Sequence, residues 1–119
     1  MPLVQVDLDR HLYDSHHAEI SKAIHAAEIE ALGMQEDDLF QVFTPHDAGE
    51  LKFDPGYNGV DRQQLVLVRL TMVHMYSVET KRALYAAVRD KLGGCGVRPE
   101  DILICIVENG FEDWYAGKL

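Results

Sequence analysis

The chain has 119 residues and a net charge of −9, from 20 acidic and 11 basic side chains. This excess of negative charge opposes binding to nucleic acid or to an anionic membrane, so neither is expected as a partner. At this length the chain is expected to form one domain. The apolar runs are too short to span a bilayer, and no secretory leader is visible. The two cysteines lack disulfide or metal-ligand spacing, which favours the reducing cytoplasm.

The first half of the chain has the pattern strand, helix, strand. Residues 3–8 alternate apolar and polar side chains and predict a half-buried strand. A helix is expected from about residue 16 to residue 32, capped by Asp14-Ser15 and ended by Gly33. Its apolar stripe consists of Ile20, Ile24, Ala27 and Ala31. A second strand is predicted at 39–44.

The second half has the same pattern after a long connection. Residues 45–63 are rich in turn formers and poor in apolar side chains, and they predict an irregular loop. The most apolar strand is expected at 65–74. Ser77 then caps a helix over 78–92. The apolar stripe of this helix consists of Leu84, Val88 and Leu92. A fourth strand is predicted at 102–107.

The two halves match each other as an internal repeat. Residues 15–38 and 77–101 both contain a cap, a helix, a glycine break and an acidic turn. We therefore predict an α+β fold made of a tandem β-α-β repeat, with units at about 2–44 and 64–109 joined by the loop at 45–63. Right-handed crossovers would give one four-stranded sheet with the two helices on one face. The other face would be uncovered, which favours self-association.

The N-terminus places a proline directly after the initiator methionine. Methionine is routinely trimmed before so small a residue, so we expect the mature chain to begin with the secondary amine of Pro2. The pKa of such an amine is closer to neutrality than that of a lysine, and at the start of a strand it can act as acid or base. In the superposition of the two halves, Pro2 lies near the place of Gln64 and Asp38 matches Asp101.

Three segments together carry a family resemblance: Met1-Pro2-Leu3, Asp38-Leu39-Phe40-Gln41, and Glu108-Asn109 followed by Asp113-Trp114. They resemble the tautomerase superfamily, in particular the branch that contains malonate semialdehyde decarboxylase. The resemblance implies duplicated β-α-β units, a homotrimer, and an enzyme that needs no cofactor. It also implies that the nitrogen of Pro2 is the catalytic group and that Asp38 works beside it.

One departure from the branch concerns the substrate. The branch has two arginines, spaced Arg-Pro-Arg, at the end of the third strand, where they are expected to hold the substrate carboxylate; this chain has His74-Met75-Tyr76 there. Neither His74 nor Tyr76 can form the two parallel hydrogen bonds that a guanidinium makes with a carboxylate. We expect His74 and Tyr76 to replace the pair weakly, and Arg62 in the loop is another candidate for binding a carboxylate.

The remaining candidates have structural alternatives. Phe40 and Trp114 are expected to accept an apolar substrate tail, although packing alone would explain Trp114 equally well. Asp38 can instead cap the turn into the second strand. His74 can be a core histidine bonded to the backbone, and Tyr76 can be an amphipathic packing residue.

Three functions stay open. In the first, Pro2 moves a proton between carbon and oxygen of a small 2-oxo acid, as in phenylpyruvate tautomerisation. In the second, a cationic Pro2 polarises a carbonyl while Asp38 activates water, as in a decarboxylase or hydratase. The third is a trimeric binding protein whose chemistry has lapsed. The histidines lack metal-ligand spacing, so no metal site is expected.

Overall fold

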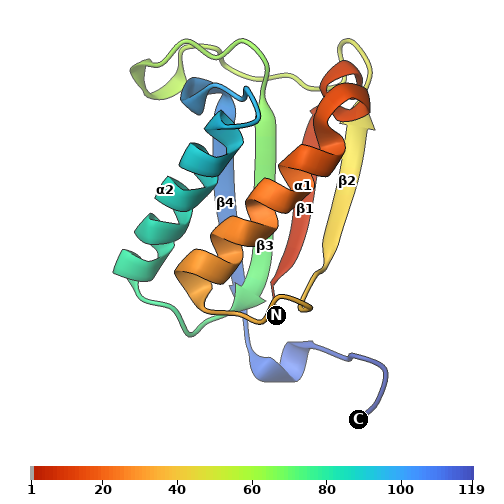
Figure 1. The fold of residues 1–119 in the computed structure, drawn as a ribbon, viewed down its shortest axis with the longest axis vertical. Helices are drawn as coiled ribbons and strands as arrows, with labels where there is room; N and C mark the ends of the chain where they lie inside the picture. The colour runs from red at the N-terminus through yellow and green to blue at the C-terminus, as the bar shows by residue number, and fades with distance from the viewer. Residues whose placement is uncertain (1) are drawn as a thin grey trace.

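A computed structural model describes residues 2–119 and contains one four-stranded sheet with both helices on the same face (Figure 1). Met1, whose removal we expect, lies outside the described residues. In chain order the elements are β1 (Leu3–Asp9), α1 (Arg10–Leu32), β2 (Gln41–His46), β3 (Val66–Val73), α2 (Val78–Gly93) and β4 (Ile102–Asn109). The strand order is β2-β1-β3-β4, and the predicted tandem β-α-β arrangement is confirmed.

The direction of the strands determines which loops meet. β1 runs parallel to β2, and β3 runs parallel to β4, as a helical crossover requires. The two units join through the antiparallel pair β1 and β3, with Leu3 opposite Thr71 and Asp7 opposite Leu67. The start of β1 therefore lies beside the end of β3.

The core lies between the sheet and the helices. Alternate residues of β1 and β3 point into it, and the predicted stripes of both helices meet them. The fully buried members are Val4, Val6, Leu8, Ile20, Ile24, Ala27, Val66, Val68, Leu70, Leu84, Val88 and Leu92. Full burial of each large aliphatic side chain contributes about 1.5–3 kcal/mol, which explains why the strand register follows the alternation.

The first helix begins earlier than predicted. α1 starts at Arg10 because the carboxylate of Asp9 accepts the backbone N–H of His11 at 2.9 Å, so Asp9, and not Asp14-Ser15, is the cap. The helix thus follows β1 with no loop between them. Its predicted end is confirmed, with Gly33 at φ 68°, the left-handed conformation that favours glycine.

The second strand begins and ends two residues later than predicted. β2 covers Gln41–His46 and includes Pro45. A proline has no N–H to donate, but β2 is an edge strand and can leave that position unpaired on its outer side.

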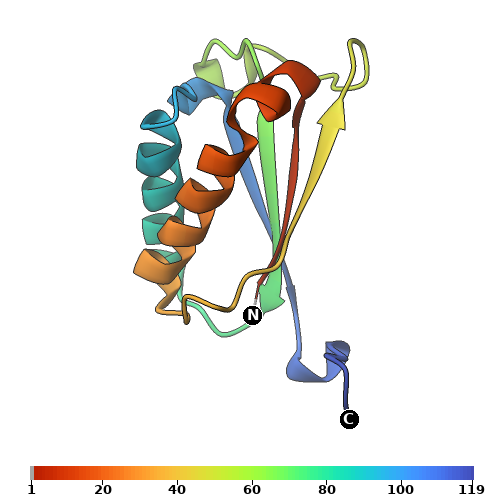
Figure 2. The same ribbon diagram turned by 45° about the vertical axis from the view of Figure 1, so that its right-hand side comes forward.

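The sheet face opposite the helices is open in one chain (Figure 2). It carries apolar side chains at high exposure: Val42 is 49% exposed, Leu103 is 41% exposed and Val107 is 46% exposed. A monomer would leave this apolar surface in water. No helix among residues 2–119 has the length and apolar character to cross a membrane.

Candidate active site

Most of the residues singled out by the sequence lie at one end of the sheet, where β1 begins and β3 ends. The start of β1, the loop between α1 and β2, the end of β3 and the segment after β4 all lie at the lower end of the molecule in Figure 1. This follows from the strand directions, because β3 ends where β1 begins. Pro2, immediately before β1, is buried at this end of the sheet.

Pro2 and Asp38 each come just before one of two strands that are paired in parallel. The backbone N–H of Val4 donates to the carbonyl of Phe40 at 3.0 Å, and Val4 is paired with Gln41. Pro2 lies two residues before Val4, and Asp38 lies three residues before Gln41. Asp38 is partly buried, and its backbone N–H donates to the carbonyl of Gln35 at 3.1 Å. Both sequence-predicted residues therefore lie at the end of the sheet where the pairing of β1 with β2 begins.

A second carboxyl group, that of Glu28 in α1, lies near Asp38. Its side chain is only 2% exposed, and burial, followed by the negative charge of Asp38, raises its pKa to about 8. Sequence reasoning missed Glu28. The available signal was its place four residues after Ile24, which puts a charged residue on the apolar stripe of the helix.

Tyr76 belongs to the same neighbourhood. Burial raises the pKa of its phenol, and the charges of Asp38 and Glu28 raise it further. Tyr76 therefore stays neutral around pH 7 and can donate a hydrogen bond. These effects couple the chain after β3 to α1 and to the loop before β2. Among residues 2–119, no three His, Cys, Asp or Glu side chains are grouped as a metal site would require.

His74 belongs to a charged cluster with Lys81 and Glu108. Its side chain is 77% exposed, so it is not a core histidine. The Nδ1–H of His74 donates to Glu108 Oε2 at 2.8 Å, and Lys81 Nζ lies 3.0 Å from the same oxygen. Lys81, and then His74, lower the pKa of Glu108. Sequence reasoning did not identify Lys81 or Glu108 as partners of His74, because strand pairing and the start of α2 bring them together.

Trp114 and Phe40 are the two aromatic residues for which the sequence predicts contact with an apolar substrate group. The indole N–H of Trp114 donates to Asn109 Oδ1 at 2.9 Å, which fixes the ring. Trp114 lines an apolar hollow of about 300 Å³ together with Val73, Phe111 and Ala116. Phe40 is 51% exposed, next to Asp38 in sequence. Both rings are therefore available for contact with an apolar group.

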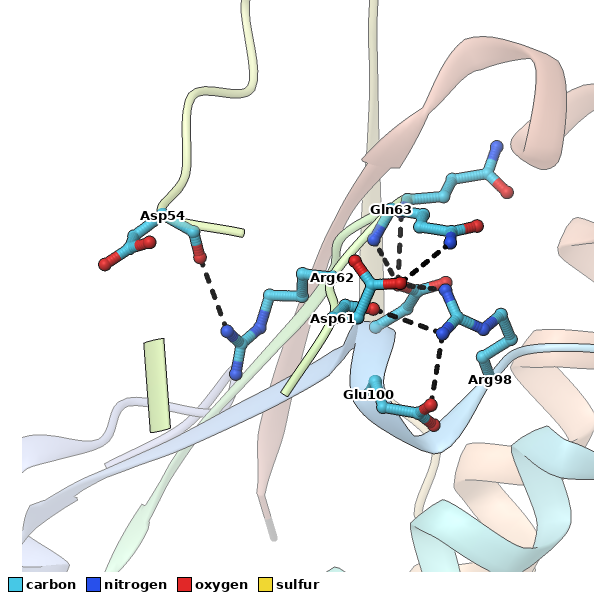
Figure 3. A network of polar contacts seen from close by, with 8 residues as sticks. Asp54, Asp61, Arg62, Gln63, Arg98 and Glu100 are labelled. Atoms are coloured by element: carbon cyan, nitrogen blue, oxygen red, sulfur yellow. Dashed lines mark hydrogen bonds and ion pairs between the residues drawn. The ribbon is translucent and has the colours of Figure 1, made fainter. Parts of the chain in front are cut away.

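Arg62 lies in a network of polar contacts in which it faces Asp54 (Figure 3). It precedes β3, whose start is paired with the end of β1, so the length of the sheet separates it from Pro2. Its guanidinium Nη1 donates to the carbonyls of Tyr57 at 2.9 Å and Asp54 at 3.4 Å, and it lies over the ring of Tyr57. Within one chain, the side chain of Arg62 anchors the loop at 45–63 and does not join the cluster around Pro2.

Comparison with known proteins gives a consistent result. The family model described as a tautomerase enzyme matches residues 38–117. The chain is 34% identical over 120 residues to the probable tautomerase YusQ of Bacillus subtilis, with 99% of this chain and 94% of that protein covered. It is 25% identical to the probable tautomerase YrdN of the same organism, with 98% and 92% covered.

Solved structures share the fold closely. The FG41 malonate semialdehyde decarboxylase inhibited by 3-bromopropiolate superposes with a TM-score of 0.91 at 29% identity, over 97% of this chain and 88% of that one. A second malonate semialdehyde decarboxylase, described with decarboxylase and hydratase activities, has a TM-score of 0.90 at 28% identity, over 98% and 91%. A fused 4-OT, solved as a symmetric trimer, has a TM-score of 0.80 at 18% identity, over 98% and 94%, and shares the fold alone.

Proposed function

This chain belongs to the tautomerase enzyme family, and on that premise we propose that it interconverts the keto and enol forms of a small 2-oxo acid, such as phenylpyruvate, without a cofactor. Pro2 carries the proton in this proposal, as the N-terminal amine of the mature chain. The observation that supports the proposal is the parallel register of β1 and β2, whose first pair, Val4 with Gln41, lies two residues after Pro2 and three residues after Asp38.

The environment of Pro2 suits a group that both accepts and returns a proton. A terminal amine has a pKa of about 7.7–8.0 before any perturbation. Burial favours its neutral form, which is the base, while the charge of Asp38 favours the cation, which is the acid. A group balanced between these two effects can remove a proton from carbon and return one in the reverse reaction.

The internal repeat supports the role of Asp38. In the second unit the matching aspartate, Asp101, accepts the backbone N–H groups of Gln63 at 2.7 Å and Gln64 at 3.1 Å. Gln64 is the counterpart of Pro2 in the superposed repeats. By analogy, we assign the carboxylate of Asp38 to the nitrogen of Pro2, where it would orient the amine and stabilise its protonated form.

Substrate binding is assigned to the side chains around this pair. The neutral phenol of Tyr76 would donate to a substrate oxygen, and Phe40 and Trp114 would contact an apolar tail. His74 would assist with the carboxylate, supported by Lys81 of the same cluster. Arg62 is not included in the proposed site of its own chain, because it lies at the other end of the sheet, before the start of β3.

The second candidate is a decarboxylase or hydratase of the malonate semialdehyde decarboxylase type. It is favoured by the TM-scores of 0.91 and 0.90 to two such enzymes and by the presence of Asp38. Here Pro2 would act as a cation that polarises a carbonyl, and Asp38 would activate water. The residues at His74-Met75-Tyr76 weigh against it, because they provide no guanidinium to orient the substrate.

The active unit is proposed to be a cytoplasmic homotrimer. The uncovered sheet face carries exposed Val42, Leu103 and Val107, and association would remove this apolar surface from water. A fused 4-OT with the same fold forms a trimer. The free Cys95 and Cys105 are compatible with a reducing compartment.

The test compares the wild type with Pro2→Ala in the ketonisation of phenylenolpyruvate, followed by ultraviolet absorbance. We expect the substitution to reduce kcat by about 10²–10⁴-fold, the range of a general acid–base group. Equal rates would refute the role of Pro2. Turnover of malonate semialdehyde alone would favour the second candidate, and turnover of neither substrate would favour a trimeric binding protein.

A further inference from the structure

A second hollow lies at the other end of the sheet from Pro2, between the loop at 45–63 and the starts of β3 and β4. Its volume is about 310 Å³, and Arg62, Lys52 and Asp54 line it. Hollows of about 300–1,000 Å³ with mostly apolar walls and a few polar groups are typical of small-molecule sites. The rest of the wall is aromatic or aliphatic and consists of Phe53, Tyr57, Leu65, Leu67 and Leu103.

Arg62 is the polar residue of this hollow whose hydrogen bonding is incomplete. It is only 9% exposed. Among the described residues, its hydrogen bonds both come from Nη1, to the carbonyls of Tyr57 at 2.9 Å and Asp54 at 3.4 Å. The Nε–H is buried and has no hydrogen-bond partner within residues 2–119. The ring of Tyr57, 5.9 Å from the guanidinium carbon, contacts the face of the cation and leaves this N–H unsatisfied.

The unsatisfied N–H belongs to the edge of the guanidinium that recognises carboxylates. The Nε–H and one N–H of Nη2 point in the same direction, so they can donate two parallel hydrogen bonds to the two oxygens of a carboxylate. Nη1 is held by the loop, so the cation of Arg62 is already in place before a ligand arrives. Such pre-organisation lowers the ordering cost of binding. A buried cation without an anionic partner is unfavourable, and a bound carboxylate would relieve this.

We propose that this hollow is a second binding site, separate from the Pro2 site, for a small monocarboxylate with an apolar body. The carboxylate would bind the Nε and Nη2 edge of Arg62, and the apolar body would contact Leu67 and Leu103. Lys52 is exposed and adds a second positive charge. In a chain of net charge −9, two basic side chains beside one acid make this hollow a local exception that favours an anion.

The chemistry of the wall limits the ligand to this class. Asp54 has its own partner, because its Oδ1 accepts the backbone N–H of Gly56 at 2.9 Å, and it meets Arg62 through its backbone carbonyl. A dicarboxylate would place its second charge against apolar side chains, which is costly. A neutral amide would leave the charge of Arg62 uncompensated. One carboxylate and one apolar group therefore fit best.

The experiment is a titration of the mature chain with 3-phenylpropanoate, followed by NMR of the methyl groups and of the arginine Nε–H groups. We expect saturable shifts at the Nε–H of Arg62 and at the methyl groups of Leu65, Leu67 and Leu103. The neutral 3-phenylpropanamide has the same apolar body and should bind at least about tenfold more weakly. The indole N–H of Trp114 reports separately on binding at the other end of the sheet.

Three variants test the residues of the site. Arg62→Lys keeps the positive charge but cannot form the two parallel bonds, and it should weaken binding by about 10–100-fold. Lys52→Gln removes an exposed charge and should weaken binding by about 2–5-fold. Arg82→Gln, a change at an exposed basic residue of α2, is the matched control and should bind like the wild type.

Three outcomes would overturn the assignment, and none of them depends on turnover at Pro2. Equal affinities for the acid and the amide would do so even if Arg62→Lys does not fold. Shifts confined to Trp114 would show that the ligand takes only the other hollow. Binding that appears in Val107→Arg, a change meant to separate the proposed trimer, but is absent in the wild type would show that a neighbouring copy fills the hollow instead of a small ligand.

Discussion

Replacing Glu28 with glutamine should change how the stability of the protein depends on pH. The pKa of Glu28 rises from 4.5 in the unfolded chain to about 8 in the folded one. Below pH 4.5 the carboxyl group is neutral in both states, so its ionisation does not change the free energy of unfolding. Between pH 4.5 and 8 the unfolded chain releases the proton more readily, so the wild type loses stability as the pH rises. At about 1.4 kcal/mol per unit, the loss reaches at most about 5 kcal/mol.

The assay is urea unfolding of the wild type and Glu28→Gln at several pH values and one protein concentration, because association also contributes to stability. The free energy of unfolding of the wild type should fall relative to that of the variant between pH 4.5 and 8, and the difference should be constant above that range. Glu30→Gln is the matched control, since its side chain is 63% exposed on the same helix. Parallel curves for the wild type and Glu28→Gln would refute the reasoning.

Two further predictions concern the fold and the assembly. Ser77→Ala should lower the free energy of unfolding by about 1 kcal/mol in urea, because the hydroxyl of Ser77 accepts the N–H of Thr80 at 3.1 Å as the cap of α2; an unchanged midpoint would contradict this role. Val107→Arg should convert the proposed trimer to monomer in light scattering, because Val107 is 46% exposed on the open sheet face; a trimer that persists would show that association uses another surface.

The fold was largely predictable because the sequence is locally consistent. Alternation in β1, the stripes of both helices and the glycine after Leu32 all specify their elements without long-range information. The start of α1 was not predictable in this way. Asp9 is both the last residue of a strand and the cap of a helix, whereas Asp14-Ser15 offered an equally good cap signal in the sequence.

The candidate site was predictable only in part. Pro2 and Asp38 stand out by their place at the start of a strand and by family resemblance. His74 was chosen by matching positions in sequence, yet its ring is exposed and bound to Glu108. Arg62 was chosen because it is near His74 in the sequence. The antiparallel pairing of β1 with β3 places it at the opposite end of the sheet from Pro2. Nearness along the chain says little about distance across a sheet.

What the sequence by itself determined is the set of elements, their repeat, and the nature of the terminal group, because these depend on local periodicity and on residue types. Only the tertiary structure decided that the side chain of Glu28 is buried and that its pKa is raised. Burial of a carboxyl is a property of the packed helix and sheet, and the pKa follows from that burial and from a neighbour ten residues away in the chain.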